Sequence, residues 1–297
     1  MKNFSRKEIT VGVIVLVLFL ASYVGIIFYA DQEPFLNGVE VKTAAPASPD
    51  HVSIFVRTMS IDPVKGETVV RFQFEPKGAL LSPDGVTLNQ TIVMDVNAET
   101  GKAEYTYKKG ERANPMDVTL GVYGLVNKYP FDSHQGELFV ALTTPLPPAK
   151  DAPKDAPIEY GDVPFSIDYL GQMNGYNISG SEAQDKDPGT ILINFQIQRS
   201  STVIAFAVFI MALKWLLALS ALFVALSVAV RGRKVELAMF SWLAALLFAL
   251  PPLRNAMPAV PPLGSFNDFA SFFWAEGIVA LSLITIVFTW LKRAGAK

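Results

Sequence analysis

Four long apolar runs divide this chain of 297 residues and restrict what it can fold into. One run lies near the start, from Ile9 to Ala30, and three lie in the last third, at about 203–230, 235–250 and 272–291. Crossing the hydrocarbon core of a bilayer takes roughly 20 apolar residues. A polar stretch of about 170 residues separates the first two runs, which is enough for one folded domain. The pattern predicts an extramembrane domain on a base of four transmembrane α-helices.

The apolar runs define three parts of the chain. We expect residues 1–30 to be an N-terminal transmembrane signal anchor, residues 31–200 an extracytoplasmic domain, and residues 201–297 a three-helix transmembrane domain. The alternative for the first run is a cleaved signal peptide. That alternative is weaker because the run is long and Phe28-Tyr29-Ala30 is a poor cleavage site.

Basic residues at the ends of the runs predict the orientation in the membrane. They form three clusters: Lys2, Arg6 and Lys7 before the first run, Arg231, Arg233 and Lys234 between the second and third, and Lys292, Arg293 and Lys297 after the fourth. Such clusters remain on the cytoplasmic side of a membrane. We therefore expect a multi-pass protein of the cytoplasmic (plasma) membrane, with both termini cytoplasmic and residues 31–200 outside.

The charge of the polar stretch limits its partners. Residues 31–200 contain 23 Asp and Glu against 14 Lys and Arg, a net charge of −9. This argues against nucleic acid, because phosphate binding needs a basic surface. The expected partners are the lipid bilayer and either further copies of this chain or another membrane protein. The chain has no Cys, so it has no disulfide and no thiolate nucleophile.

Residues 31–200 alternate apolar and polar side chains, as half-buried strands do. In the run 69–74, Phe72 and Phe74 share one face while Arg71 and Gln73 share the other. Similar runs lie at 52–57, 91–96, 118–123, 138–142, 165–170 and 191–197. Turn residues separate them, which predicts an all-β antiparallel sandwich. Two Pro- and Ala-rich segments, 41–50 and 144–157, are predicted to be spacers.

The residues that usually carry catalysis or bind metals are sparse. His51 and His134 are the only histidines, neither has metal-ligand spacing, and no nucleophile-elbow or P-loop motif is present. We therefore expect no cofactor, no metal site and no enzymatic activity. The alternative, an ectoenzyme, requires a pocket that holds one of these histidines beside a nucleophile and a carboxylate.

Three charged residues lie in or at the predicted spans. Lys214 lies well inside the second run, and a membrane lysine usually faces protein or water. Glu276 lies about one turn inside the fourth run, so we hypothesise a Lys214–Glu276 ion pair. The alternative is a snorkelling Lys214 with an interfacial Glu276. Glu236 begins the third run, where it could act simply as a helix cap.

The segment 251–264 contains five prolines, at positions 251, 252, 258, 261 and 262, together with Arg254. Its prolines exclude a regular helix and stiffen the connection between the third and fourth runs. This loop would lie directly beneath the outer domain and is well placed to contact it. The alternative is a plain connector.

Two resemblances follow from these segments. Tyr129–Asp132, Leu250–Gly264 and Phe272–Ala275 resemble a bacterial, largely actinobacterial, membrane family known as domain-of-unknown-function family 4436, over nearly the whole chain. That family implies no activity. Tyr129-Pro130-Phe131-Asp132 is also similar to the aromatic-Pro-Phe-Asp motif of pentameric ligand-gated ion channels. There the motif lies on a β-sandwich loop that touches the membrane domain.

The channel resemblance extends to Phe195–Arg199, with Arg199 at the position of a basic residue before the first channel helix. It implies that the third span lines a pore with Glu236 at its inner mouth. The chain departs from that family because the third span is almost wholly apolar, a span precedes the domain, and no helix follows the fourth run.

We expect Tyr129, Pro130, Phe131, Asp132, Arg199 and Arg254 to couple the domain to the membrane part. The predicted function is a non-enzymatic envelope receptor-like, scaffold or accessory protein. A ligand-gated-channel-like ion channel and an ectoenzyme are the alternatives.

Overall fold

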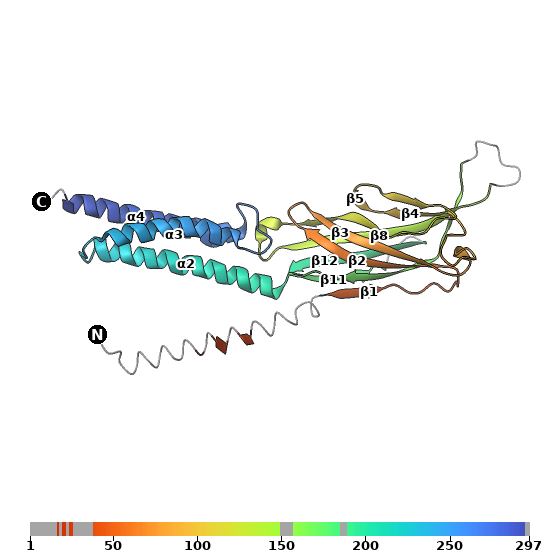
Figure 1. Ribbon diagram of the computed structural model, residues 1–297, viewed down its shortest axis with the longest axis horizontal. Helices are drawn as coiled ribbons and strands as arrows, with labels where there is room; N and C mark the ends of the chain where they lie inside the picture. The colour runs from red at the N-terminus through yellow and green to blue at the C-terminus, as the bar shows by residue number, and fades with distance from the viewer. Residues whose placement is uncertain are drawn as a thin grey trace.

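The computed structural model describes residues 38–148, 157–184 and 189–294, together with five isolated positions between 17 and 25. The strands occupy one end of a long molecule and the labelled helices occupy the other (Figure 1). The predicted first span falls almost wholly outside the described residues. The predicted extramembrane domain and the three C-terminal helices fall within them.

The strands follow one another with short connections. They are β1 (Val39–Lys42), β2 (Val52–Asp62), β3 (Glu67–Pro76), β4 (Ile92–Val96), β5 (Ala98–Thr100), β6 (Glu104–Tyr107), β7 (Met116–Gly124), β8 (Ser133–Pro145), β9 (Tyr160–Asp162), β10 (Phe165–Gly171), β11 (Tyr176–Glu182) and β12 (Thr190–Arg199), with 3₁₀ turns η1 (Gly78–Leu80) and η2 (Val126–Lys128). Their main hydrogen-bonded order is β1-β10-β2-β3-β7-β8-β12-β11.

Strand β7 joins two halves of this sheet, because it pairs with β3 over residues 67–72 and with β8 over residues 134–136. Inward side chains of both halves meet in one core, for example Phe72 from β3 and Leu138 from β8. The alternation of buried and exposed positions along β2, β3, β8 and β12 produces this layering. The predicted β-rich core is therefore confirmed.

The predicted purely antiparallel pairing is wrong, because the sheet is mixed. Strand β10 runs parallel to β2, with Phe165 opposite Val52 and Leu170 opposite Arg57. The chain reaches β10 only after passing through the other half of the sheet at β8, and a parallel partner needs such a long return. Alternation within a strand carries no information about the direction of its neighbour.

The two predicted spacers are shorter than expected. Val41 is buried in β1 and pairs with Tyr169 of β10, so it belongs to the sheet. Pro145 ends β8 opposite Tyr160 of β9. A proline is tolerated at a strand end that pairs with a short edge strand. Residues 149–156 of the second spacer lie outside the described residues.

Three helices follow the sheet: α2 (Ser201–Ala229), α3 (Leu237–Asn255) and α4 (Phe273–Ala294), the last preceded by the π-helical turn η3 (Asp268–Phe272). All three are long and apolar enough to cross a membrane. The expectation that the prolines after residue 250 exclude a helix is wrong for Pro251 and Pro252, which lie inside α3. They lie in its last turns, and each lacks the N–H that would donate to the carbonyl four residues earlier. The helix nevertheless continues past them, since the Ala256 N–H donates to the Pro252 carbonyl.

Candidate functional site

Strand β12 runs directly into helix α2, with one residue between them. Arg199 ends the strand, and Ser200 caps the helix by accepting a hydrogen bond from the Val203 N–H at 3.3 Å. The inward-facing residues of β12 are apolar until Arg199, which is the last of them and is only 5% exposed. The chain therefore carries a buried cation at the point where sheet becomes helix.

Two neighbouring strands place polar side chains beside Arg199. Tyr176 begins β11 and lies opposite Arg199, and His134 near the start of β8 lies opposite Ile197. Both side chains point inward, at 8% and 2% exposure. Asp132 lies just before β8 and is also buried. We call Tyr129, Asp132, His134, Tyr176 and Arg199 the junction cluster.

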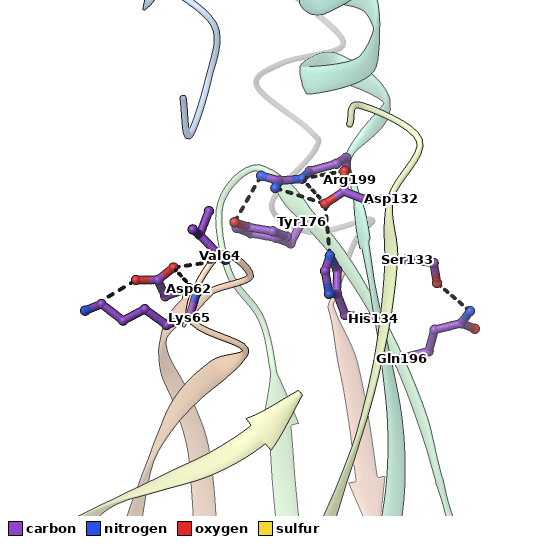
Figure 2. Close-up of polar contacts among 9 residues, drawn as sticks. All are labelled: Asp62, Val64, Lys65, Asp132, Ser133, His134, Tyr176, Gln196 and Arg199. Carbon is purple, nitrogen blue, oxygen red and sulfur yellow. Dashed lines mark hydrogen bonds and ion pairs between the residues drawn. The ribbon is translucent and has the colours of Figure 1, made fainter. Parts of the chain in front are cut away.

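Asp132 and Arg199 form the centre of the junction cluster (Figure 2). The Arg199 Nε lies 3.1 Å from both carboxylate oxygens of Asp132, and Nη2 donates to Oδ2 at 3.0 Å. The His134 Nε2 lies 3.0 Å from the same oxygen and donates to it, because an ionised carboxylate only accepts. The other ring nitrogen of His134, Nδ1, is buried and has no hydrogen-bond partner among the residues that the structure describes.

Aromatic rings flank the guanidinium. The Arg199 Cζ lies 5.1 Å from the ring centroid of Tyr129 and 5.0 Å from that of Tyr176, within the range of cation–π attraction. The Arg199 Nη1 also donates to the Tyr176 hydroxyl at 3.1 Å. An ion pair, two aromatic rings and an imidazole thus lie in contact in one buried site.

Burial and hydrogen bonds set the protonation of the cluster. Burial alone would raise the pKa of Asp132, but the bonds from His134 and Arg199 outweigh it and hold that pKa below its ordinary value. The carboxylate is therefore ionised at neutral pH. Burial raises the pKa of Tyr129 to about 12, so its phenol stays protonated and can donate a hydrogen bond.

Tyr129 carries the junction cluster onto the helices. Its hydroxyl donates to the carbonyl of Pro258, in the loop between α3 and η3, at 3.0 Å. Its ring packs with Ala207 and Ile210 of α2 and with Met257. The β domain therefore contacts both α2 and the α3–η3 loop.

The other two residues of the predicted motif lie around Tyr129. Pro130 is buried and follows a cis peptide bond. Phe131 is 55% exposed, and its ring meets the edge of Phe266 at a centroid distance of 6.0 Å. The structure thus brings Tyr129, Pro130, Phe131, Asp132 and Arg199 together at the junction.

Arg254 lies in a second buried cluster and makes no hydrogen bond or ion pair to the junction cluster among the described residues. Its Nε and Nη2 donate to the two oxygens of Asp268 at 3.0 Å each, and Nη2 also donates to the Pro261 carbonyl at 2.8 Å. The Gly264 N–H donates to Asp268 as well. Arg254 therefore links the end of α3 to the start of η3 and fixes the loop between them, which contains Pro258, the partner of Tyr129.

Lys214 belongs to this second cluster, and its expected ion pair with Glu276 is wrong. The Lys214 Nζ donates to Asn267 Oδ1 at 3.0 Å, and the lysine is fully buried. Asn267 stands just before η3, whereas Glu276 lies nine residues further, roughly 13 Å along a helix axis. Glu276 Oε2 is buried and finds no partner within the described part of the chain.

Glu236 lies at the other end of the helices, away from both clusters. It occupies the N-cap position of α3, and its side chain makes no capping hydrogen bond. Its backbone carbonyl accepts a bond from the Met239 N–H. The Glu236 carboxylate therefore lies at the N-terminus of α3, where a negative charge is favourable to the helix dipole, but it makes no capping hydrogen bond among the described residues.

Sequence reasoning did not place four residues in these clusters: Tyr176, Asn267, Asp268 and His134, the last of which was considered only as an active-site histidine. His134 and Tyr176 could have been found from the alternation, because each begins the inward series of its strand and the next two inward residues are apolar or Gly. Asn267 and Asp268 immediately precede an apolar run. That position offers no signal of a buried partner.

The sequence comparisons divide the chain at the same point as the fold. Residues 42–198 match a family described as "Domain of unknown function (DUF4436)", and residues 199–293 match one described as "Domain of unknown function (DUF8686)". The boundary falls at Arg199, where β12 ends and the helical part begins. Among curated proteins no sequence matches this chain. Because the first match spans more than half of its residues, the chain belongs to the DUF4436 family.

Proposed function

We propose that this chain is a non-enzymatic, receptor-like protein of the bacterial cytoplasmic membrane. Its β domain faces the envelope, and its helices carry the state of that domain into the bilayer. The apolar helices α2, α3 and α4 support a membrane location. The basic clusters beside them favour cytoplasmic termini. The first apolar run then acts as a retained signal anchor and fourth span.

One observation carries this proposal: the junction cluster fixes the residue from which α2 continues, Arg199, and also bonds to the α3–η3 loop through Tyr129. Arg199 ties the end of β12, and so the start of α2, to the start of β8 through Asp132. Tyr129, in the loop that precedes β8, donates a hydrogen bond to the carbonyl of Pro258. A displacement of β8 or β12 would therefore move α2 and the α3–η3 loop together, which is what a receptor needs.

The ectoenzyme alternative has less support. His134 does lie beside a carboxylate, but it is only 2% exposed and its Nε2 is bonded to Asp132. The neighbouring hydroxyl, Ser133, accepts a bond from Gln196 at 2.8 Å and lies apart from the cluster (Figure 2). A substrate would have no access to this imidazole.

A channel is the second candidate, favoured by one specific contact. The Tyr129–Asp132 loop meets both Arg199 and the α3–η3 loop, as the resemblance to ligand-gated channels implies. Against it, the exposed positions of α3 include Leu237 and Phe248, which are 81% and 82% exposed. A wetted ion path normally presents polar rings. The receptor-like role therefore ranks first.

Imaging of the full-length protein in lipid nanodiscs separates these functions. We expect a monomer, or a complex with a different membrane protein, in which the outer domain presents a free surface. A five-fold ring with α3 on its axis, together with ion flux into liposomes, would contradict the receptor-like role and establish the channel.

A further inference from the structure

A groove of about 960 Å³ crosses the outer face of the β domain, on strands β7, β8, β12 and β11. It lies on the opposite face of these strands from the core, since its main side chains are the outward members of each alternation. The volume is within the range of natural sites for small ligands. Neither family description assigns a role to it.

Two cross-strand rows of polar side chains form the groove. In the first row Tyr123, Gln135, Gln196 and Ser179 stand opposite one another on four consecutive strands. The second row runs two residues further from the junction. There Glu137 stands opposite Asn194, and Asn194 stands opposite Ser181. Directly opposite side chains in a sheet lie about 5 Å apart, so each row offers evenly spaced polar groups.

Small residues keep the groove open. A Cβ atom at Gly121 would come within 2.6 Å of a Glu99 carboxylate oxygen and 2.7 Å of the Tyr123 hydroxyl. Gly121 therefore leaves room for these two groups, which bond each other at 2.9 Å. On β11 the lining side chains are the short Ser179 and Ser181.

Most of the polar groups in the groove are unused by the fold. Gln135, Glu137 and Asn194 are exposed, and their side chains make no hydrogen bond within the described part of the chain. Glu99 uses one carboxylate oxygen for Tyr123. The surface therefore presents amide donors and many oxygen acceptors at fixed spacing, ready for a ligand that carries several hydroxyl groups.

The charge and the one aromatic ring restrict the ligand class further. The groove has two carboxylates, Glu99 and Glu137, and its described lining contains no Lys, Arg or His. An anionic ligand is therefore repelled. The Tyr123 ring is 68% exposed and offers an apolar face beside polar groups. The C–H face of a sugar ring stacks on such a surface while its hydroxyls bond to amides and carboxylates.

We infer that this groove binds an uncharged oligosaccharide chain laid across β7, β8, β12 and β11. Tyr123 stacks on one sugar ring, and Gln135, Gln196, Glu137 and Asn194 bond to hydroxyl groups of that ring and its neighbours. This inference deepens the proposed receptor-like function and rests on it for its physiological meaning. Binding itself requires no coupling to the membrane part.

The groove also lies next to the junction cluster in the sheet. Gln135 follows His134 directly on β8, and Gln196 bonds Ser133, which follows Asp132. A sugar that bonds to Gln135 or Gln196 acts on strand positions three residues from the buried ion pair, since Gln135 is three residues after Asp132 and Gln196 is three residues before Arg199. The ligand site and the coupling site are thus on the same two strands, β8 and β12.

Calorimetric titration of the full-length protein in nanodiscs tests the inference. The probes are maltohexaose, cellohexaose and mannohexaose, with a chitosan hexamer and hexagalacturonate as charged counterparts. We expect at least one neutral hexamer to bind. Tyr123→Ala, and separately the pair Gln135→Ala and Gln196→Ala, should weaken its binding at least tenfold.

Matched controls come from outside the groove. Tyr160→Ala removes a similarly exposed ring on β9, and Gln73→Ala removes an exposed amide on β3; neither should change binding. All variants should keep the melting temperature of the parent protein, because the changed side chains are largely outside the core. No binding by any neutral hexamer, or binding unchanged by Tyr123→Ala, would overturn the inference.

The remaining outcomes are equally decisive. Binding of the chitosan hexamer alone, lost with added salt, would overturn the inference in favour of a cation site. Binding of a neutral hexamer at the groove together with a five-fold conducting ring would support the groove and overturn the receptor-like role. The failure of one proposal can therefore be told from the failure of the other.

Discussion

Arg199 and Asp132 form a buried ion pair, so removing the charge of one residue leaves the other charge buried without a partner. Asp132→Asn leaves the guanidinium buried beside a neutral amide. Removing one partner of a buried pair costs about 3 kcal/mol or more. We expect the free energy of unfolding of the β domain to fall by about 3 kcal/mol, measured by urea titration of the full-length protein in nanodiscs.

The control for this substitution is the exposed pair of Arg71 and Asp117, which bond at 2.6 Å with both side chains more than 40% exposed. Exposed ion pairs contribute little to stability. Asp117→Asn should therefore leave the unfolding midpoint almost unchanged. Equal losses for Asp132→Asn and Asp117→Asn would contradict the importance assigned to the junction cluster.

The Asp132 carboxylate makes the free energy of unfolding of the β domain depend on pH. Since the pKa of Asp132 is held below its ordinary value of about 3.9, the unfolded chain takes up its proton at higher pH than the folded chain. Its contribution to stability is complete above about pH 5 and is lost as the pH falls through the folded pKa. The difference in unfolding free energy between the parent protein and Asp132→Asn should shrink below pH 4, and a constant difference would contradict this.

At the scale of elements, local patterns predicted what elements form but not which elements pair. Alternation around Phe72 and Ile54 identified the strands, because burial on one face is a property of each strand alone. The parallel pairing of β2 with β10 depends on the path of the chain between them, which no short pattern encodes. The last turns of α3 were missed because Pro251 and Pro252 were expected to exclude a helix, whereas α3 continues past both.

The site shows the same limit. Tyr129 through Asp132 and Arg199 were identified by resemblance to a motif, and their contact with Pro258 depends on where the α3–η3 loop folds. Lys214 was singled out as a charge within an apolar run, and the structure places it, fully buried, inside α2. Its partner was misassigned because the depth of Asn267 follows from the irregular turn before α4, which hydropathy does not show.

The helix α2 is tied to η3 through Lys214 and Asn267, and a double-mutant cycle can measure this bond. We expect Lys214→Met and Asn267→Leu to show a coupling free energy of about 1 kcal/mol, typical of polar bonds between membrane helices. The cycle of Lys214→Met with Glu276→Gln should give a value near zero. The reverse result would restore the Lys214–Glu276 pair. Reversible unfolding in mixed micelles provides the readout.

On the scale of the whole molecule, the absence of Cys makes orientation directly measurable, because each introduced Cys is unique. Lys102 is exposed on the β domain, and Lys234 is exposed between α2 and α3. We expect Lys102→Cys to react with an impermeant maleimide in intact cells, and Lys234→Cys to react only after the membrane is opened. The opposite pattern would contradict the proposed topology.

The central claim is that the junction cluster joins the β domain and the helices into one mechanical unit. The most direct test is a distance distribution between spin labels at Gln73→Cys on β3 and Val230→Cys at the end of α2, measured by pulsed electron resonance in nanodiscs. We predict one narrow distribution for the parent sequence and a clearly broader one when Asp132→Asn is added. A distribution that is broad from the start, or that Asp132→Asn leaves unchanged, would contradict the claim.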